Sequence, residues 1–160
     1  MSFNMTLKTA GAVLLMLATA VSYWFICPCG VIPGGPLFGE MVTEPVEDWS
    51  FVNDKAAVPL CQIEVDFPIP RAMNVNCMST GGDLFVSCSG CADKQWAARV
   101  LAHPNGIVQA AGKVYPITYE RVTDEAKLDR IWAARLSKIG KDLSARPDHW
   151  WSFGLIQKSG

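Results

Sequence analysis

Hydroxyl, thiol and cationic side chains gather in one stretch near the middle of the chain. The stretch contains Ser87, Cys88, Ser89, Cys91, Lys94 and Arg99. Cations, hydroxyls and backbone N–H groups at the beginning of a helix are the groups that bind phosphates, and a helix is predicted from Asp93 onwards. Residues of these types are suited to an anionic group, but their presence alone does not establish such a site. For an isolated pair of cations, the usual interpretation is that Lys94 and Arg99 are ordinary solvent-facing charges of that helix.

Cys88 and Cys91 form a Cys-x-x-Cys motif immediately before the predicted helix. A thiol in this position has a lowered pKa because the N-terminus of a helix favours the thiolate. The motif could therefore be a redox-active dithiol. The surrounding sequence lacks the βαβ frame of thioredoxin-like proteins, so we expect a local structural disulfide between these two residues and keep the redox function as the alternative.

Cys61 and Cys77 are a second candidate disulfide pair. They are equally distant from Ile69, the middle of a predicted turn, so a simple hairpin would place them opposite each other and close enough to bond. The remaining thiols, Cys27 and Cys29, could join the Cys-x-x-Cys motif in a four-thiolate zinc or iron–sulfur site. One intervening residue is tighter than the usual ligand spacing, so we predict no metal.

The two histidines, His103 and His149, have no carboxylate or serine partner at a recognisable spacing. A hydrolytic triad therefore has no support, and no catalytic residue is assigned. The aromatic residues Trp150, Trp151 and Phe153 could close the core, line a pocket, or contact lipid or a neighbouring subunit.

Short strands and two helices must position these side chains. Alternating apolar and polar residues predict strands at 60–66 and 72–78. Further strands are predicted at 84–87, 107–111, 113–121 and 151–157. A proline-rich turn is expected at 67–71. Helices are expected at 93–102 and from Thr123, as the N-cap, to Gly140. This order predicts an α+β domain, a small antiparallel barrel with two flanking helices.

Residues 10–26 form an apolar run of 17 residues without a charge. This is close to the ~20 residues that cross a bilayer as a helix, so we predict a single transmembrane anchor. Lys8 before the run and Glu40 as the first charge after it place the N-terminus in the cytoplasm and the domain in the periplasm of a bacterial inner membrane. A signal peptide cleaved after Ala20 and a buried core helix are the alternatives.

The predicted organisation is an anchor at 1–27, a connector rich in proline and glycine with an extended lead-in at 28–48, and a barrel domain at 49–160. The net charge of −1 argues against nucleic-acid binding, which needs a basic face. If the domain faces an oxidising space, disulfides are favoured over metal.

The barrel region resembles the flavin-binding split β-barrel family, which includes pyridoxamine 5'-phosphate oxidase and the deazaflavin-dependent nitroreductases. The segments that carry the resemblance are 82–87 (GDLFVS), 93–96 (DKQW), 100–104 (VLAHP), 113–115 (KVY) and 120–124 (ERVTD). The resemblance implies a split β-barrel fold and FMN or a related flavin as cofactor.

The resemblance also implies a set of cofactor-binding residues. They are Asn76, Ser87, Ser89, Lys94, Trp96 and Arg99. Trp96 could stack near a ring system or belong to the core, and Asn76 could contact a flavin edge or face solvent. The sequence departs from the oxidase pattern because strand 72–78 lacks the usual basic residue, while Arg71 lies in the predicted turn.

Three functions are consistent with these features. The first is a membrane-anchored, flavin-dependent oxidoreductase of the split-barrel class. The second is a non-catalytic accessory subunit of a larger membrane complex, with the barrel but no cofactor. The third is a periplasmic thiol–disulfide protein using Cys88 and Cys91. The expected partners are the lipid bilayer, through residues 10–26, and a membrane complex or a second copy of the chain.

Overall fold

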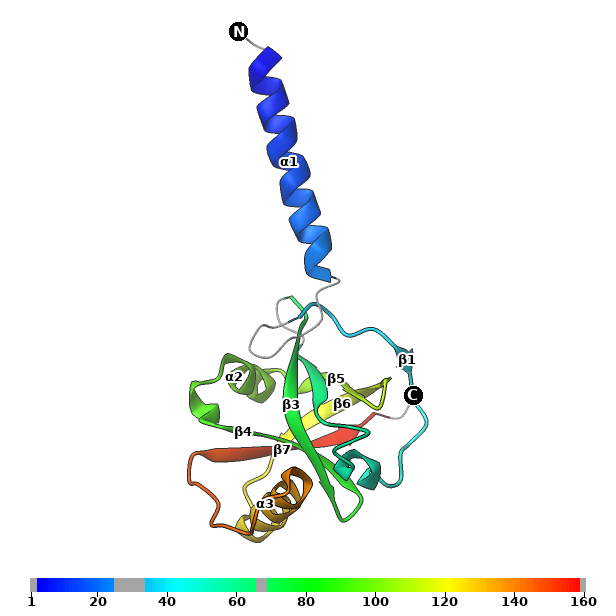
Figure 1. Cartoon of the computed structure of the whole chain (residues 1–160), viewed down its shortest axis with the longest axis vertical. Helices are drawn as coiled ribbons and strands as arrows, with labels where there is room; N and C mark the ends of the chain where they lie inside the picture. The colour runs from blue at the N-terminus through cyan, green and yellow to red at the C-terminus, as the bar shows by residue number, and fades with distance from the viewer. Residues whose placement is uncertain (1–2, 25–33, 66–68, 159–160) are drawn as a thin grey trace.

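Six antiparallel strands form a closed barrel in the computed structural model, which describes residues 3–24, 34–65 and 69–158 (Figure 1). The strands are β2 (Cys61–Val65), β3 (Arg71–Thr80), β4 (Asp83–Ser89), β5 (Asn105–Ala110), β6 (Lys113–Arg121) and β7 (Trp150–Gln157). Their order is β6-β5-β2-β3-β4-β7, and pairing between β6 and β7 closes the ring. The short strand β1 (Glu40–Met41) pairs with β6 in parallel. The predicted α+β class and antiparallel barrel are confirmed.

Successive side chains of each strand point alternately into the barrel and toward its outer face, as the pleat of a strand requires. On β4, Leu84 and Val86 belong to the apolar cluster inside the barrel. Phe85, between them, belongs to a second cluster, under a helix on the outer face. The inner cluster also contains Ile63 and Ile117, which are fully buried. The barrel interior is therefore a packed core.

Helix α3 (Glu125–Ile139) covers the outer face of the barrel over β3, β4 and β7 (Figure 1). Its cap differs from the prediction: the Asp124 carboxylate, not the Thr123 side chain, accepts a hydrogen bond from the Lys127 backbone N–H at 2.6 Å. The helix ends, as predicted, at Gly140, whose φ of 67° lies in the left-handed region.

Helix α2 (Gln95–Ala102) begins two residues later than predicted. The 3-10 helix η2 (Cys91–Asp93) comes first, and Lys94 is the N-cap residue of α2. The Cys-x-x-Cys motif therefore does not directly precede an α-helix. A second 3-10 helix, η1 (Ser50–Asn53), follows the lead-in, and its Asn53 exchanges two hydrogen bonds with the backbone of Ser79 on β3.

Both predicted disulfides are present, Cys61–Cys77 and Cys88–Cys91. The predicted register is wrong, however, because Cys61 lies opposite Val75 and the first bond is diagonal. The pairing is shifted by two residues from the predicted one, and Arg71 joins the ladder opposite Val65 instead of lying in the turn. The two remaining cysteines lie outside the described residues.

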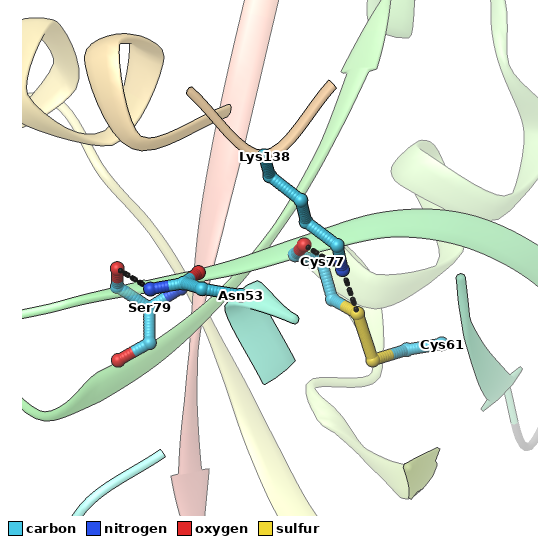
Figure 2. Close-up of a disulfide and its surroundings, with 5 residues drawn as sticks. All are labelled: Asn53, Cys61, Cys77, Ser79 and Lys138. Carbon is cyan, nitrogen blue, oxygen red and sulfur yellow. Dashed lines mark hydrogen bonds between the residues drawn. A yellow bond between two sulfur atoms is a disulfide. The ribbon is translucent and has the colours of Figure 1, made fainter. Parts of the chain in front are cut away.

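Lys138 of α3 reaches down to the Cys61–Cys77 disulfide (Figure 2). Its ammonium donates a hydrogen bond to the carbonyl oxygen of Cys77 at 2.8 Å, and lies 3.5 Å from the Cys77 sulfur. Burial lowers the pKa of the Lys138 ammonium to about 8.

An N-terminal helix, α1 (Phe3–Trp24), occupies the predicted apolar segment. It projects away from the barrel (Figure 1), and large apolar side chains such as Leu14 and Leu15 are 68% exposed. Among the described residues, no helix combines the length and apolar character that a membrane crossing requires. The predicted transmembrane anchor is therefore not supported.

Candidate anion-binding cleft

A cleft of about 310 Å³ on the outer face of the barrel brings most of the predicted site residues together. It is lined by Asn74, Val75, Asn76, Ser87, Cys88, Ser89, Lys94, Trp96, Arg135 and Trp150. Five of the six candidate residues are in this set. The sixth, Arg99, lies on α2 outside the cleft lining.

Strand register explains why these side chains converge. Asn76 on β3 lies opposite Ser87 on β4, and Ser89 lies opposite Trp150 on β7. Side chains on one face of a strand recur every second residue, so Ser87 and Ser89 share the outer face with Phe85. Helices α2 and α3 then border this face and add the cations.

Three polar atoms of the cleft residues are buried without a hydrogen-bond partner among the described residues. They are Ser87 Oγ, Arg135 Nε and Trp150 Nε1. Ser87 is 3% exposed and Trp150 is 1% exposed. Leaving a buried donor unpaired costs about 1–3 kcal/mol, and folded proteins rarely tolerate such groups without a reason. A polar ligand in the cleft could pair with donors that the protein leaves free.

The charges of the cleft favour an anion. Lys94 and Arg135 line it, and among the described residues no carboxylate does. The Arg135 guanidinium is held by the ring of Trp132, whose centre lies 5.0 Å from Cζ. Partial burial lowers the pKa of Arg135, but an arginine in a protein still keeps its charge.

Trp96 lies both against the core and at the cleft, the two positions considered for it from the sequence. Its ring lies 5.5 Å from that of Phe153, against the core inside the barrel. It also lines the cleft. Trp96 can thus offer an aromatic surface to a ligand while the core fixes its position.

Comparison with known proteins gives structural matches only. No family model matches the chain, and no curated protein matches its sequence. A proposed pyridoxamine 5'-phosphate oxidase from Listeria innocua has 12% identity and a TM-score of 0.53, covering 62% of this chain and 84% of that one. A NimC/NimA family protein from Clostridium acetobutylicum has 9% identity and a TM-score of 0.51, covering 66% and 78%.

A conserved hypothetical protein from Mycobacterium tuberculosis has 9% identity and a TM-score of 0.54, covering 74% of this chain and 85% of that one. The chain has the split β-barrel fold. The predicted resemblance is confirmed at this level, and similarity this distant shows the fold alone.

A second, uncharged cleft of about 400 Å³ adjoins the first on the split barrel, and Asn74 lines both. Its polar side chains are three amides that lie in one row across β3, β2 and β5: Asn74, Gln62 and Gln109. Small apolar residues such as Ala57 and Ala110 complete it. The two clefts therefore offer a charged and a neutral compartment side by side.

A larger cleft of about 540 Å³ does not include any of the predicted site residues. Its lining contains the carboxylates of Glu47, Asp83, Glu120 and Asp124. One of its cations, Lys127, is paired with Asp83 at 3.7 Å. These charges disfavour an anionic ligand, so size alone does not identify the site.

Sequence reasoning missed Arg135 and Trp150 as site residues. Arg135 belongs to a group of basic residues on the second predicted helix, and Trp150 is an aromatic residue for which a pocket was one of several options. Both are distant from Ser87 in the chain, and only the packing of α3 and β7 against β3 and β4 brings them near it.

Among the described residues, no group of three or more histidine, cysteine, aspartate or glutamate side chains could hold a metal ion. The four-thiolate alternative also conflicts with the Cys88–Cys91 disulfide, because a metal would need both sulfurs as free thiolates.

Proposed function

We propose that this split barrel binds a flavin-type cofactor, FMN or a deazaflavin, with the phosphate in the charged cleft. The observation that carries the proposal is the convergence of two cations and three donors in one cleft, where the described part of the chain supplies neither a carboxylate nor hydrogen-bond partners for these donors. One structural neighbour is named as an oxidase of a phosphate ester, pyridoxamine 5'-phosphate. That name supports the same ligand chemistry.

The phosphate would be bound by charge and by hydroxyl donors. Lys94 and Arg135 provide the charge, and Ser87 and Ser89 provide hydroxyls on the same strand face. Hydrogen bonds between cations and phosphate oxygens are about twice as strong as neutral ones. Arg135 Nε and Ser87 Oγ have no competing partner among the described residues.

The neutral part of the cofactor would extend from the charged cleft past Asn74 into the amide-lined cleft. Amide side chains can both donate to and accept from the polar edge of a ring system. Asn76 and Trp96 lie at the charged end and would orient the chain that joins the ring to the phosphate. A bound flavin supplies hydride and single-electron transfer, which makes the protein an oxidoreductase.

Titration of FMN with the purified full-length protein tests the proposal, with quenching of flavin fluorescence as the measure of binding. We expect saturable binding that weakens with salt, because screening reduces the attraction of Lys94 for phosphate. The Lys94→Gln substitution should raise Kd about tenfold, the equivalent of one charged hydrogen bond.

Lys158→Gln is the matched control, since Lys158 is exposed and lines none of the three clefts described above. Its Kd should equal that of the wild type. Absence of FMN binding by the wild type, or equal affinities for the two variants, would contradict the proposal. A deazaflavin with a phosphate-bearing tail should be titrated in parallel to separate the two cofactors.

Location and partners are separate proposals that depend on the sequence alone. The barrel lies in the periplasm, and residues 10–26 contact the bilayer. The protein partner is a membrane complex or a second copy of the chain. Membrane fractionation with an alkaline wash tests the location, and recovery of the full chain in the washed soluble fraction would contradict it. The accessory-subunit function also stays a prediction.

A further inference from the structure

The two disulfides of the split barrel lie in different environments. Cys61 and Cys77 are both 0% exposed, inside the core. Cys91 is also 0% exposed, but Cys88 is partly exposed and lines the charged cleft. A molecule in this cleft can therefore approach Cys88, whereas neither residue of the core disulfide is exposed to it.

The cleft surrounds Cys88 with the conditions that favour a thiolate. Lys94 and Arg135 line the same cleft, and no carboxylate of residues 3–24, 34–65 or 69–158 does. Neighbouring cations stabilise a cysteine thiolate, the reactive form in disulfide exchange. The same cations attract a negatively charged molecule to this wall of the cleft.

We propose that the Cys88–Cys91 disulfide is redox-active and accepts two electrons from thiols that carry a negative charge. The inference depends on the proposed function only in one respect: the same cations would attract both the cofactor phosphate and the negatively charged thiol. The disulfide would then be a second redox centre beside the cofactor site.

The exchange proceeds in two steps. The thiolate of the incoming molecule attacks the Cys88 sulfur, the bond between the two protein sulfurs breaks, and Cys91 leaves and takes up a proton because its burial disfavours the thiolate. A second thiolate attacks the sulfur of the incoming molecule in the mixed disulfide, and Cys88 is released as the thiolate. Two small thiols are oxidised to one disulfide, and the protein disulfide is reduced to two thiols.

The test compares a negatively charged thiol, 3-mercaptopropionate, with neutral 2-mercaptoethanol on the native full-length protein. The two are used at equal thiolate concentration and low salt. Samples are quenched by alkylation, and mass spectrometry of the peptides reports each cysteine, while circular dichroism confirms that the fold is retained. The core disulfide Cys61–Cys77 is the internal control.

We expect Cys88 and Cys91 to be alkylated while Cys61 and Cys77 remain bonded. The charged thiol should react about fivefold faster, the size of one screened charge interaction. This advantage should disappear in high salt and decrease in Lys94→Gln, which leaves Arg135 in place, but it should be unchanged in Lys158→Gln. The proposal is overturned if Cys88–Cys91 opens no sooner than Cys61–Cys77, or if charge on the thiol has no effect.

FMN titration of the same samples separates this inference from the proposed function. If FMN does not bind but the charged thiol still opens Cys88–Cys91 faster, the cofactor proposal fails and the disulfide proposal stands. If FMN binds and the disulfide is inert, the disulfide proposal alone fails.

Discussion

Two buried serines that face each other across β4 and β7 have opposite hydrogen-bonding states. Ser152 is fully buried, and its Oγ donates to the carbonyl oxygen of Val86 at 3.1 Å. Ser87, its register partner, has a buried Oγ without a partner among the described residues. The pair therefore separates a hydroxyl that supports the fold through a hydrogen bond from one that makes no such contribution.

Alanine substitutions at the two serines should have opposite consequences. Ser152→Ala should lower the free energy of unfolding by about 1 kcal/mol through the lost hydrogen bond. Ser87→Ala should leave it unchanged or raise it, because no bond is lost, yet it should weaken FMN binding. Urea unfolding and FMN titration measure the two effects. Equal destabilisation by both substitutions would contradict the assignment of Ser87.

A second residue-scale prediction concerns the pH dependence of Lys138. Burial lowers its pKa from 10.5 to about 8 in the folded protein. Between these two values the unfolded chain holds a proton that the folded protein has released, so stability increases with pH in this range. Below about pH 8 the folded protein bears the full cost of the buried charge.

Comparison with Lys138→Met isolates this effect, since methionine does not titrate. The stability of the wild type relative to the variant should rise from about pH 8 to about pH 10.5 and stay level below pH 8. Buried tyrosines such as Tyr119, whose pKa is raised by burial, titrate in both proteins and cancel in the difference. A flat difference across the range would show that Lys138 is not desolvated.

At the scale of elements, the sequence predicted the strands well and the details of their ends less well. Alternation of apolar and polar residues identified β2 and β3, because a half-buried strand must alternate. The register was missed by two residues, and Arg71 extends β3 into the predicted turn. No local signal distinguishes these two outcomes, since pairing of Arg71 depends on how β2 and β3 meet.

The helix cap of α3 illustrates the same limit. Thr123 and Asp124 are adjacent, and both residue types can cap a helix. Asp124→Ala should lower the free energy of unfolding by about 1 kcal/mol, while Thr123→Ala should be nearly neutral. Thermal or urea unfolding of the two variants measures this. A larger effect at Thr123 would reverse the assignment.

At the scale of the whole molecule, the candidate site is a product of barrel closure. The sequence placed Ser87, Ser89 and Lys94 near each other because they are close in the chain. Arg135 and Trp150 could not be added, because their position depends on α3 crossing β3 and on β7 pairing with β4. Long-range packing therefore supplied the cleft residues that local patterns could not predict.

The barrel should fold without the N-terminal helix. Its ring of hydrogen bonds closes between β6 and β7, and the described side chains of α1 are exposed. Removal of residues 1–33 keeps Gly34, whose N–H donates to the carbonyl oxygen of Ala72 at 2.8 Å. We expect the free energy of unfolding to change by less than about 0.5 kcal/mol. A loss of cooperative unfolding would show that α1 is part of the folding unit.

The alternation along β4 also has an evolutionary consequence. Leu84 and Val86 face the packed interior, whereas Ser87 and Ser89 face the cleft. Substitutions at the outward positions can therefore change ligand preference while the inward positions keep the scaffold intact. Descendants of one such barrel can diverge in chemistry until little sequence identity remains, with the architecture preserved by the inward half of each strand.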